Sequence, residues 1–374
     1  MNSITSINEL GQSIWLDYMD LFSNDHSEIK KLINKYKISG ITSNHTIFEN
    51  TISKQNRYNP LMKKLYTTKT INIKNIYENL ICYQIKKIAD ILIPIYYKTN
   101  KLNGYISLAI SPYLANDTIQ TINEAKKLWN KIARPNLMIK IAATDEGIEA
   151  IEHLVYHGIN INVTLLFSPK YYKKAAIAFM TGLKNRIRDD KDIKSITSVA
   201  SCFISRVDHK FNELILKTLT SKNILLKQCL NNVAIANAKI IFQIYKKIYK
   251  SHNWKKISIK GGKKQQLLWA STSNKNSKYS KTRYLEELIA PQTINTVNPE
   301  TLKYFLKYGS VKNTIETNLN KSYKIFQILK QENISFNNES NELLKNGVNI
   351  FKLSFNKLLN FIIKQQKIFN NKIL

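Results

Sequence analysis

Lys140 lies in an apolar segment that would give its amine an unusual chemistry. It stands between two isoleucines, and residues 137–142 read Leu-Met-Ile-Lys-Ile-Ala. If this segment is a strand, Met138, Lys140 and Ala142 share one face. Burial without a partner is costly for an ammonium group and lowers the lysine pKa. A lysine with a lowered pKa can attack a carbonyl near neutral pH, so we predict that Lys140 is a nucleophile. The alternative is a lysine on an edge strand that extends to solvent.

Residues 160–165 alternate between polar and apolar side chains, as expected for a strand. The polar residues share one face: Asn160, Asn162 and Thr164. The apolar residues share the other face: Ile161, Val163 and Leu165. Several inward polar groups are unfavourable in a packed core, whereas they suit a hydroxyl-bearing ligand or an ordered water. We therefore predict that Asn162 and Thr164 belong to a binding site.

Two more polar residues stand near the carboxyl ends of candidate strands. Asp17 shares a face with Trp15, and its carboxylate could take part in proton transfer. Asn44 follows the second candidate strand and could hydrogen-bond a carbonyl or hydroxyl group. The alternative for Asn44 is a simple N-cap of the next helix.

A further group of residues could bind a phosphate. Arg206 lies just past a candidate strand, and its guanidinium could clamp a phosphate or could pair with Asp208 instead. Ser201 and Phe203 share one face of that strand. Two candidates follow the seventh strand, where barrels often bind phosphate: Ser271 and Lys275.

The elements that must position these residues have the pattern of parallel strands joined by helices. Eight short apolar or β-branched runs predict strands at 13–18, 40–43, 105–111, 137–142, 161–167, 196–205, 266–271 and 293–296. Helical apolar spacing recurs between them, as at 76–97, 117–132, 145–157, 169–188 and 233–249. This alternation predicts the α/β class and a (β/α)8 TIM barrel, whose active site lies at the carboxyl ends of the strands.

The pattern changes beyond residue 310, where Lys- and Asn-rich helical segments follow without a strand-like run. We predict two regions: a barrel over residues 1–310 and a helical C-terminal extension over 311–374 that packs on the barrel. The alternative for the extension is a basic amphipathic helix on a membrane surface.

The composition argues against several other classes of protein. Of the 57 basic residues only six are arginine, and lysines occur from end to end of a chain with a net charge of +31. Specific nucleic-acid binding usually concentrates charge and favours arginine, so we predict no specific nucleic-acid partner, although nonspecific polyanion binding stays an alternative.

Cysteine content and hydropathy indicate a compartment. The three cysteines form no disulfide framework and no zinc motif, which fits a reducing environment and predicts no metal. No secretory signal is visible at the N-terminus, and no apolar run is long enough to span a membrane. We predict a cytoplasmic protein without a transmembrane segment. Its oligomeric state is left open, with a dimer among the options.

Eight segments together resemble the transaldolases, in the longer bacterial form with a C-terminal extension. They occur in the family's order and cover about residues 1–310: WLDYMD, GITSNHTIFEN, RPNLMIKIAAT, NINVTLLFS, SVASCFISRVD, AIANAK, LLWASTSNKN and EELIAPQTINT. The resemblance implies a class I aldolase-type barrel without a metal or organic cofactor. It also implies transfer of a dihydroxyacetone unit through a lysine Schiff base, in the non-oxidative pentose phosphate pathway. The implied donor is sedoheptulose 7-phosphate or fructose 6-phosphate, and the acceptor is glyceraldehyde 3-phosphate or erythrose 4-phosphate.

The resemblance also implies a role for each matching residue. Lys140 matches the Schiff-base lysine, Asp17 the acid/base aspartate, and Thr164 the threonine that helps to hold the catalytic water. Asn44 and Asn162 match groups that bind donor hydroxyls. The remaining matches line the phosphate end or the wall of the pocket: Ser201, Arg206, Ser271, more loosely Lys275, and Phe203.

Two residues depart from the family pattern. Ala109 stands where the family usually has a glutamate that activates the water, so the resemblance implies reduced turnover. His45 stands where a proline usually follows the asparagine, which implies a less rigid loop, and a new catalytic histidine is the alternative. Ala109 keeps open a second function, a noncatalytic barrel that binds sugar phosphates.

Overall fold

Eight parallel strands form a closed barrel in the computed structural model, which describes residues 3–19, 27–54, 72–274, 276 and 278–370. The strands follow one another in chain order: β1 (Gln12–Asp17), β2 (Gly40–Thr42), β3 (Tyr105–Ala109), β4 (Leu137–Ala142), β5 (Ile161–Leu166), β6 (Ser198–Phe203), β7 (Gln266–Ala270) and β8 (Thr293–Val297). β1 pairs with β8 and closes the ring. The predicted (β/α)8 barrel is confirmed. The edge-strand alternative for Lys140 is wrong, because β4 lies between β3 and β5.

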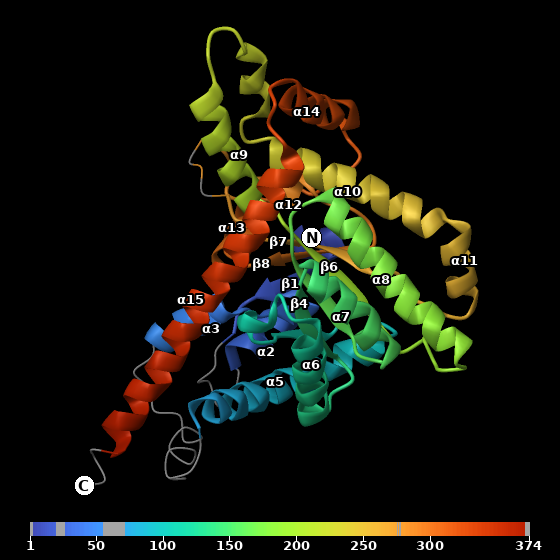
Figure 1. Ribbon diagram of the computed structural model, residues 1–374, viewed down its shortest axis with the longest axis vertical. Coiled ribbons are helices and arrows are strands. Elements are labelled where there is room, and N and C mark those ends of the chain that lie inside the picture. Colours follow the sequence, from blue (N-terminus) through green and yellow to red (C-terminus); the bar gives the residue numbers. More distant parts are fainter. Residues whose placement is uncertain (1–2, 20–26, 55–71, 275, 277, 371–374) are drawn as a thin grey trace.

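Helices surround the barrel (Figure 1). Those that precede β7 are α1 (Ser3–Glu9), α2 (Ser27–Tyr36), α3 (His45–Lys54), α5 (Ile73–Lys98), α6 (Thr118–Ile132), α7 (Asp145–Tyr156), α8 (Pro169–Arg188), α9 (Ser205–Thr218), α10 (Val233–Lys250) and α11 (His252–Ile259). Those that follow β7 are α12 (Arg283–Glu287), α13 (Pro299–Tyr308), α14 (Leu319–Gln331) and α15 (Phe336–Asn370). The described residues also form two 3₁₀ turns, η1 (Pro112–Leu114) and η2 (Ile224–Cys229). Several helices begin at a capping side chain, as where Thr144 accepts from the Gly147 amide at the start of α7.

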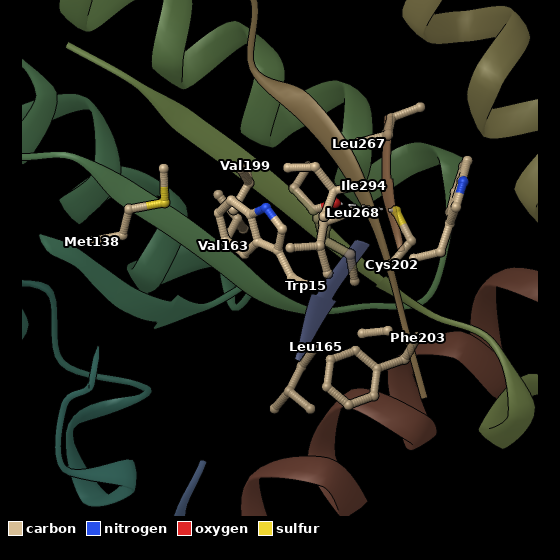
Figure 2. Packing of buried hydrophobic residues seen from close by; sticks show 14 of the residues in the cluster. Trp15, Met138, Val163, Leu165, Val199, Cys202, Phe203, Leu267, Leu268 and Ile294 are labelled. Atoms are coloured by element: carbon tan, nitrogen blue, oxygen red, sulfur yellow. Dashed lines mark hydrogen bonds between the residues drawn. The ribbon is translucent and has the colours of Figure 1, made fainter. Parts of the chain in front are cut away.

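Large apolar side chains fill the interior of the barrel. Trp15 is fully buried, and Figure 2 shows its indole ring among Leu268 and Ile294. Gly40 makes room for this ring, because a Cβ on that residue would lie 2.4 Å from two of the indole carbons. With this packed floor, a ligand can enter only beyond it, where the strands end.

The strand register places the predicted site residues side by side. Ala109 pairs with Lys140, and Lys140 pairs with Asn162. Asp17 pairs with Thr42 in the same way. Paired residues of parallel strands point to the same side of the sheet, so these side chains face the interior together.

Leu165 departs from the predicted alternation. Its φ is +58°, and the pairing of β5 with β6 shifts register between Val163 and Leu166. The left-handed backbone turns the Leu165 side chain toward Gly347 of α15 instead of leaving it on the face of Val163. The prediction that Leu165 shares a face with Ile161 and Val163 is therefore wrong.

α15 runs across the molecule beside α3 (Figure 1) and also contacts α5, α9 and β5. Its apolar residues Phe351, Phe355 and Leu358 are buried. This packing argues against the membrane-surface alternative, since the apolar stripe is covered by the barrel and its helices. Among the described helices, none is both long and apolar enough to cross a membrane. The division of the chain at residue 310 stays a prediction.

Candidate active site

A cavity of about 710 Å³ opens at the carboxyl ends of the strands. Its walls include most of the residues that the sequence singles out: Asp17, Asn44, Lys140, Ser201, Phe203, Arg206 and Ser271. A volume of this size accommodates a small phosphorylated metabolite. The structure thus brings together residues from the ends of five strands: β1, β2, β4, β6 and β7.

Lys140 lies on the wall of this cavity with only 4% of its surface exposed. Its Nζ donates a hydrogen bond to the Ser43 carbonyl oxygen at 3.2 Å. Burial lowers the pKa of Lys140, and the positive charge of Arg206 lowers it further, whereas the Asp17 carboxylate opposes the change. The neutral amine is therefore more populated at a given pH than in an exposed lysine, as a nucleophile requires.

Asp17, the last residue of β1, lines the same cavity as Lys140. Its Oδ1 accepts from Thr42 Oγ1 at 2.8 Å, and Thr42 Oγ1 also lies 2.8 Å from Thr296 Oγ1. Burial raises the pKa of Asp17, while Lys140 and the Thr42 hydrogen bond act in the opposite direction. A carboxyl group with a raised pKa is suited to accept and return a proton during a reaction.

Asn162 is held by two hydroxyl groups, one on β3 and one on the neighbouring strand β6. Its Nδ2 donates to Ser107 Oγ at 2.9 Å, and its Oδ1 accepts from Ser201 Oγ at 2.7 Å. Ser201 therefore lies deep in the barrel against Asn162. These bonds fix the amide beside Lys140, but Asn162 is fully buried and does not line this cavity, so its contact with a substrate hydroxyl stays a prediction.

Arg206 lines the cavity without an ion pair to any described residue. Its Nη1 is buried without a hydrogen-bond partner there, and its guanidinium stacks 5.2 Å from the ring of Phe203. Asp208 accepts instead from the Ala234 amide at 2.7 Å and from Tyr284 Oη at 2.8 Å. The alternative of an Arg206–Asp208 ion pair is therefore wrong. A buried guanidinium with unused donors is typical of an anion-binding site.

Ser271 lies near Arg206 in a strained turn after β7. Its φ is +57°, and its Oγ lies 2.8 Å from Ser205 Oγ. The two hydroxyls line the same cavity as Arg206. They add hydrogen-bonding groups to the positively charged wall, as a phosphate site needs.

Three predicted residues have other surroundings. Asn44 lines the cavity, and its Oδ1 caps α3 by accepting from the Ile47 amide at 2.9 Å, so the N-cap alternative is confirmed and its contact with a substrate stays a prediction. Thr164 lies on a second, smaller cavity that also touches Lys140. Lys275 lies outside the described residues.

Sequence reasoning missed some residues that support the site. Thr42 and Ser107 share the inward faces of their strands, so the period-two test used for β5 could have found both. Phe351 comes from α15 and lies 6.0 Å from the Arg206 guanidinium. No local signal in the sequence links a residue of the C-terminal helix to this cavity. Across the described residues, His, Cys, Asp and Glu form no cluster of three or more that could hold a metal ion.

Comparisons with known proteins agree with this geometry. The family model described as transaldolase/fructose-6-phosphate aldolase matches residues 14–362. A transaldolase of Trichodesmium erythraeum is 41% identical over 374 residues, which cover 98% of each chain. Transaldolase 2 of a Nostoc species is 41% identical over 368 residues and 96% of each chain. A transaldolase of Frankia alni is 33% identical over 365 residues and 97% of each chain.

Proposed function

The chain belongs to the transaldolase/fructose-6-phosphate aldolase family and is a transaldolase, and from this premise we propose that Lys140 is its Schiff-base residue. The observation that carries this proposal is an almost fully buried amine with a lowered pKa on the wall of the main cavity, which Asp17 also lines. A dihydroxyacetone unit is transferred from fructose 6-phosphate or sedoheptulose 7-phosphate to glyceraldehyde 3-phosphate or erythrose 4-phosphate. This reaction belongs to the non-oxidative pentose phosphate pathway.

The reaction begins when Lys140 Nζ attacks the ketose carbonyl carbon. A C–N bond forms, the carbonyl oxygen leaves as water, and an iminium ion results. This cation withdraws electrons from the neighbouring C–C bond, so one difficult step becomes two easier ones. Ser107 and Ser201 hold the Asn162 amide. In this proposal Asn162 orients the hydroxyl groups of the bound sugar.

Asp17 accepts a proton in the cleavage step and later returns it. It accepts the proton of the C4 hydroxyl as the C3–C4 bond breaks, and the bonding electrons move to the iminium, which becomes an enamine. The first aldose leaves. The enamine then attacks the aldehyde carbon of the second aldose, and Asp17 returns the proton to the new hydroxyl. Hydrolysis of the iminium releases the product and restores the Lys140 amine.

A trapping experiment tests the role of Lys140. Borohydride added with fructose 6-phosphate should reduce the iminium to a stable amine, and peptide mass mapping should find the adduct on Lys140. An unmodified Lys140 in enzyme that turns over would contradict the covalent mechanism. Binding of the sugar phosphate without adduct and without turnover would instead support the noncatalytic barrel.

Arg206 supplies the main contact with the substrate phosphate in this proposal. Arg206→Leu is expected to raise KM for fructose 6-phosphate by about 10²-fold, because one to two charge-assisted hydrogen bonds are lost. Arg206→Lys should restore only part of the affinity, since lysine lacks the two-pronged geometry. Arg283→Leu is the matched control, because Arg283 stacks on Tyr279, donates to Asn232 and does not line the main cavity. An equal rise in KM for a ketose without phosphate would argue against the phosphate contact.

We also propose a cytoplasmic location and a C-terminal extension over residues 311–374. The three cysteines are free and buried, which is compatible with a reducing compartment. The contacts of α15 with the barrel support the assignment of the extension as a cover of the active-site end.

A further inference from the structure

A second cavity of about 30 Å³ lies next to the main one. Lys140 lines both cavities, so the small one reaches the amine that the proposed function uses. Its other walls include His45 of α3, Ala109 of β3, Thr164 and Leu165 of β5, and Phe351 of α15. A space of this size holds one water molecule and is too small for a substrate.

Three polar atoms on the side chains around this cavity have no hydrogen-bond partner among the described residues. They are Nδ1 and Nε2 of His45 and Oγ1 of Thr164. His45 is 1% exposed and Thr164 is 3% exposed, so bulk solvent does not satisfy these atoms. Buried polar groups are nearly always paired with protein or with ordered water, and each exception needs an explanation.

His45 is held in place by the C-terminal helix. Its ring packs edge-on against Phe355 with a centroid distance of 5.1 Å and lies 6.1 Å from Phe351. Burial, with a smaller effect from the Lys140 charge, lowers the pKa of His45 to about 3. The imidazole is therefore neutral at physiological pH and offers one N–H donor and one acceptor nitrogen.

Ala109 shapes the same cavity from the adjacent strand β3. It pairs with Lys140 in the sheet register and contributes only a methyl group. The unpartnered polar atoms of His45 and Thr164, together with the Lys140 amine, line this cavity and can bind a water molecule. Two to four such partners are what a buried water requires.

We propose that His45 is a positioning residue which, with Thr164, binds one water molecule against Lys140. This inference rests on the proposed function of Lys140. When the C–N bond forms, positive charge develops on Nζ and negative charge on the former carbonyl oxygen. The bound water accepts a proton from Nζ and donates one of its own to that oxygen, so the water is regenerated and no proton is lost. His45 keeps its charge state throughout and orients the water.

Two replacements of His45 test this role. His45→Phe, which keeps an aromatic ring between Phe351 and Phe355, is expected to slow formation of the borohydride-trapped adduct by about 10²-fold with KM nearly unchanged. His45→Gln keeps a donor and an acceptor and should recover most of the rate. In mixtures of H2O and D2O, the wild-type adduct rate should depend on the deuterium fraction with curvature, because two protons move together. The phenylalanine variant should lose this curvature.

Thr164 provides a second approach with a matched control. Thr164→Val removes the other group that binds the water. Because His45→Phe removes a ligand of the same water, the double variant should slow adduct formation by less than the product of the two single-variant factors. Thr121→Val makes the same change on the same cavity wall, where the Thr121 hydroxyl already donates to the Leu114 carbonyl at 2.8 Å, and should leave the adduct rate unchanged.

The outcomes separate this inference from the proposed function. If wild type forms the Lys140 adduct and folded His45→Phe forms it equally fast, the water site is wrong and the Schiff base stands. If wild type forms no adduct, the proposed function fails first. If His45→Phe does not fold, the Thr164 series decides: an adduct rate in Thr164→Val equal to that of wild type and Thr121→Val would overturn the shared water.

Discussion

Lys140→Met is expected to abolish transfer of the dihydroxyacetone unit while the protein stays folded. Methionine has nearly the same length and no amine, so the C–N bond cannot form. Loss of a covalent nucleophile removes the pathway itself, and residual activity should lie at least about 10⁴-fold below wild type. The measurement is a coupled assay that consumes the released triose phosphate.

The Lys140→Met variant is expected to fold because the side chain at position 140 is buried. Lys140 is buried, and burial destabilises its charged form. Because its pKa is lowered in the folded state, the unfolded chain binds more protons, and the lysine costs stability below its ordinary pKa. Methionine removes this cost, so the thermal midpoint should not fall. The advantage of methionine should shrink as the pH approaches the pKa of an exposed lysine, where the wild-type amine is neutral in both states.

Lys239→Met is a matched control. Lys239 in α10 is 3% exposed, and burial also lowers its pKa. Its amine, however, donates to the Thr317 carbonyl at 2.9 Å and lies 3.5 Å from a Glu287 carboxylate oxygen. We expect this variant to keep its turnover and to lose about 1–3 kcal/mol of stability, because the Thr317 carbonyl loses its donor. Equal loss of activity in both variants would show that burial of any lysine matters more than the position of Lys140.

The barrel and its inward residues could be predicted because a parallel strand obeys a simple period. All eight strand segments agree with the structure within two residues at each end, and Lys140 and Asn162 face inward as the alternation requires. Leu165 shows where this reasoning stops. Its positive φ arises from a shift between β5 and β6, and a leucine carries no local signal for that backbone.

The surroundings of His45 could not be predicted for a different reason. His45 and Phe355 are separated by 310 positions, and only the packing of α15 beside α3 brings their rings together. The position of Arg206 could be predicted more directly, because a residue just past β6 lies at the active-site end of the barrel. Its stacking on Phe351 again depends on α15. Local patterns thus predicted what the strands carry, whereas the contribution of the C-terminal helix required the tertiary structure.

Asp17→Asn is expected to lower kcat by about 10²–10⁴-fold, because the amide cannot accept the proton released during C–C bond cleavage. The fold should tolerate the change, since an amide oxygen can still accept from Thr42 Oγ1. Formation of the Lys140 adduct should survive, so trapping with borohydride should continue while turnover falls. Continued trapping together with reduced turnover would show that Asp17 acts in a step after Schiff-base formation.

The pH profile gives Asp17→Asn a second, independent readout. The negative charge of Asp17 raises the pKa of Lys140, against the lowering by burial and by Arg206. Removal of that charge lowers the Lys140 pKa further, so the neutral amine appears at lower pH and the rising limb of adduct formation should shift in that direction. Asp208→Asn is the control, since the Asp208 carboxylate is bound by Ala234 and Tyr284. Asp208→Asn should lower the stability of the fold by about 1–3 kcal/mol and leave the rising limb of the pH profile of adduct formation unshifted. If the rising limb of the pH profile does not move in Asp17→Asn, the Asp17 and Lys140 side chains do not interact. The proposed proton transfer by Asp17 beside Lys140 would then lose its support.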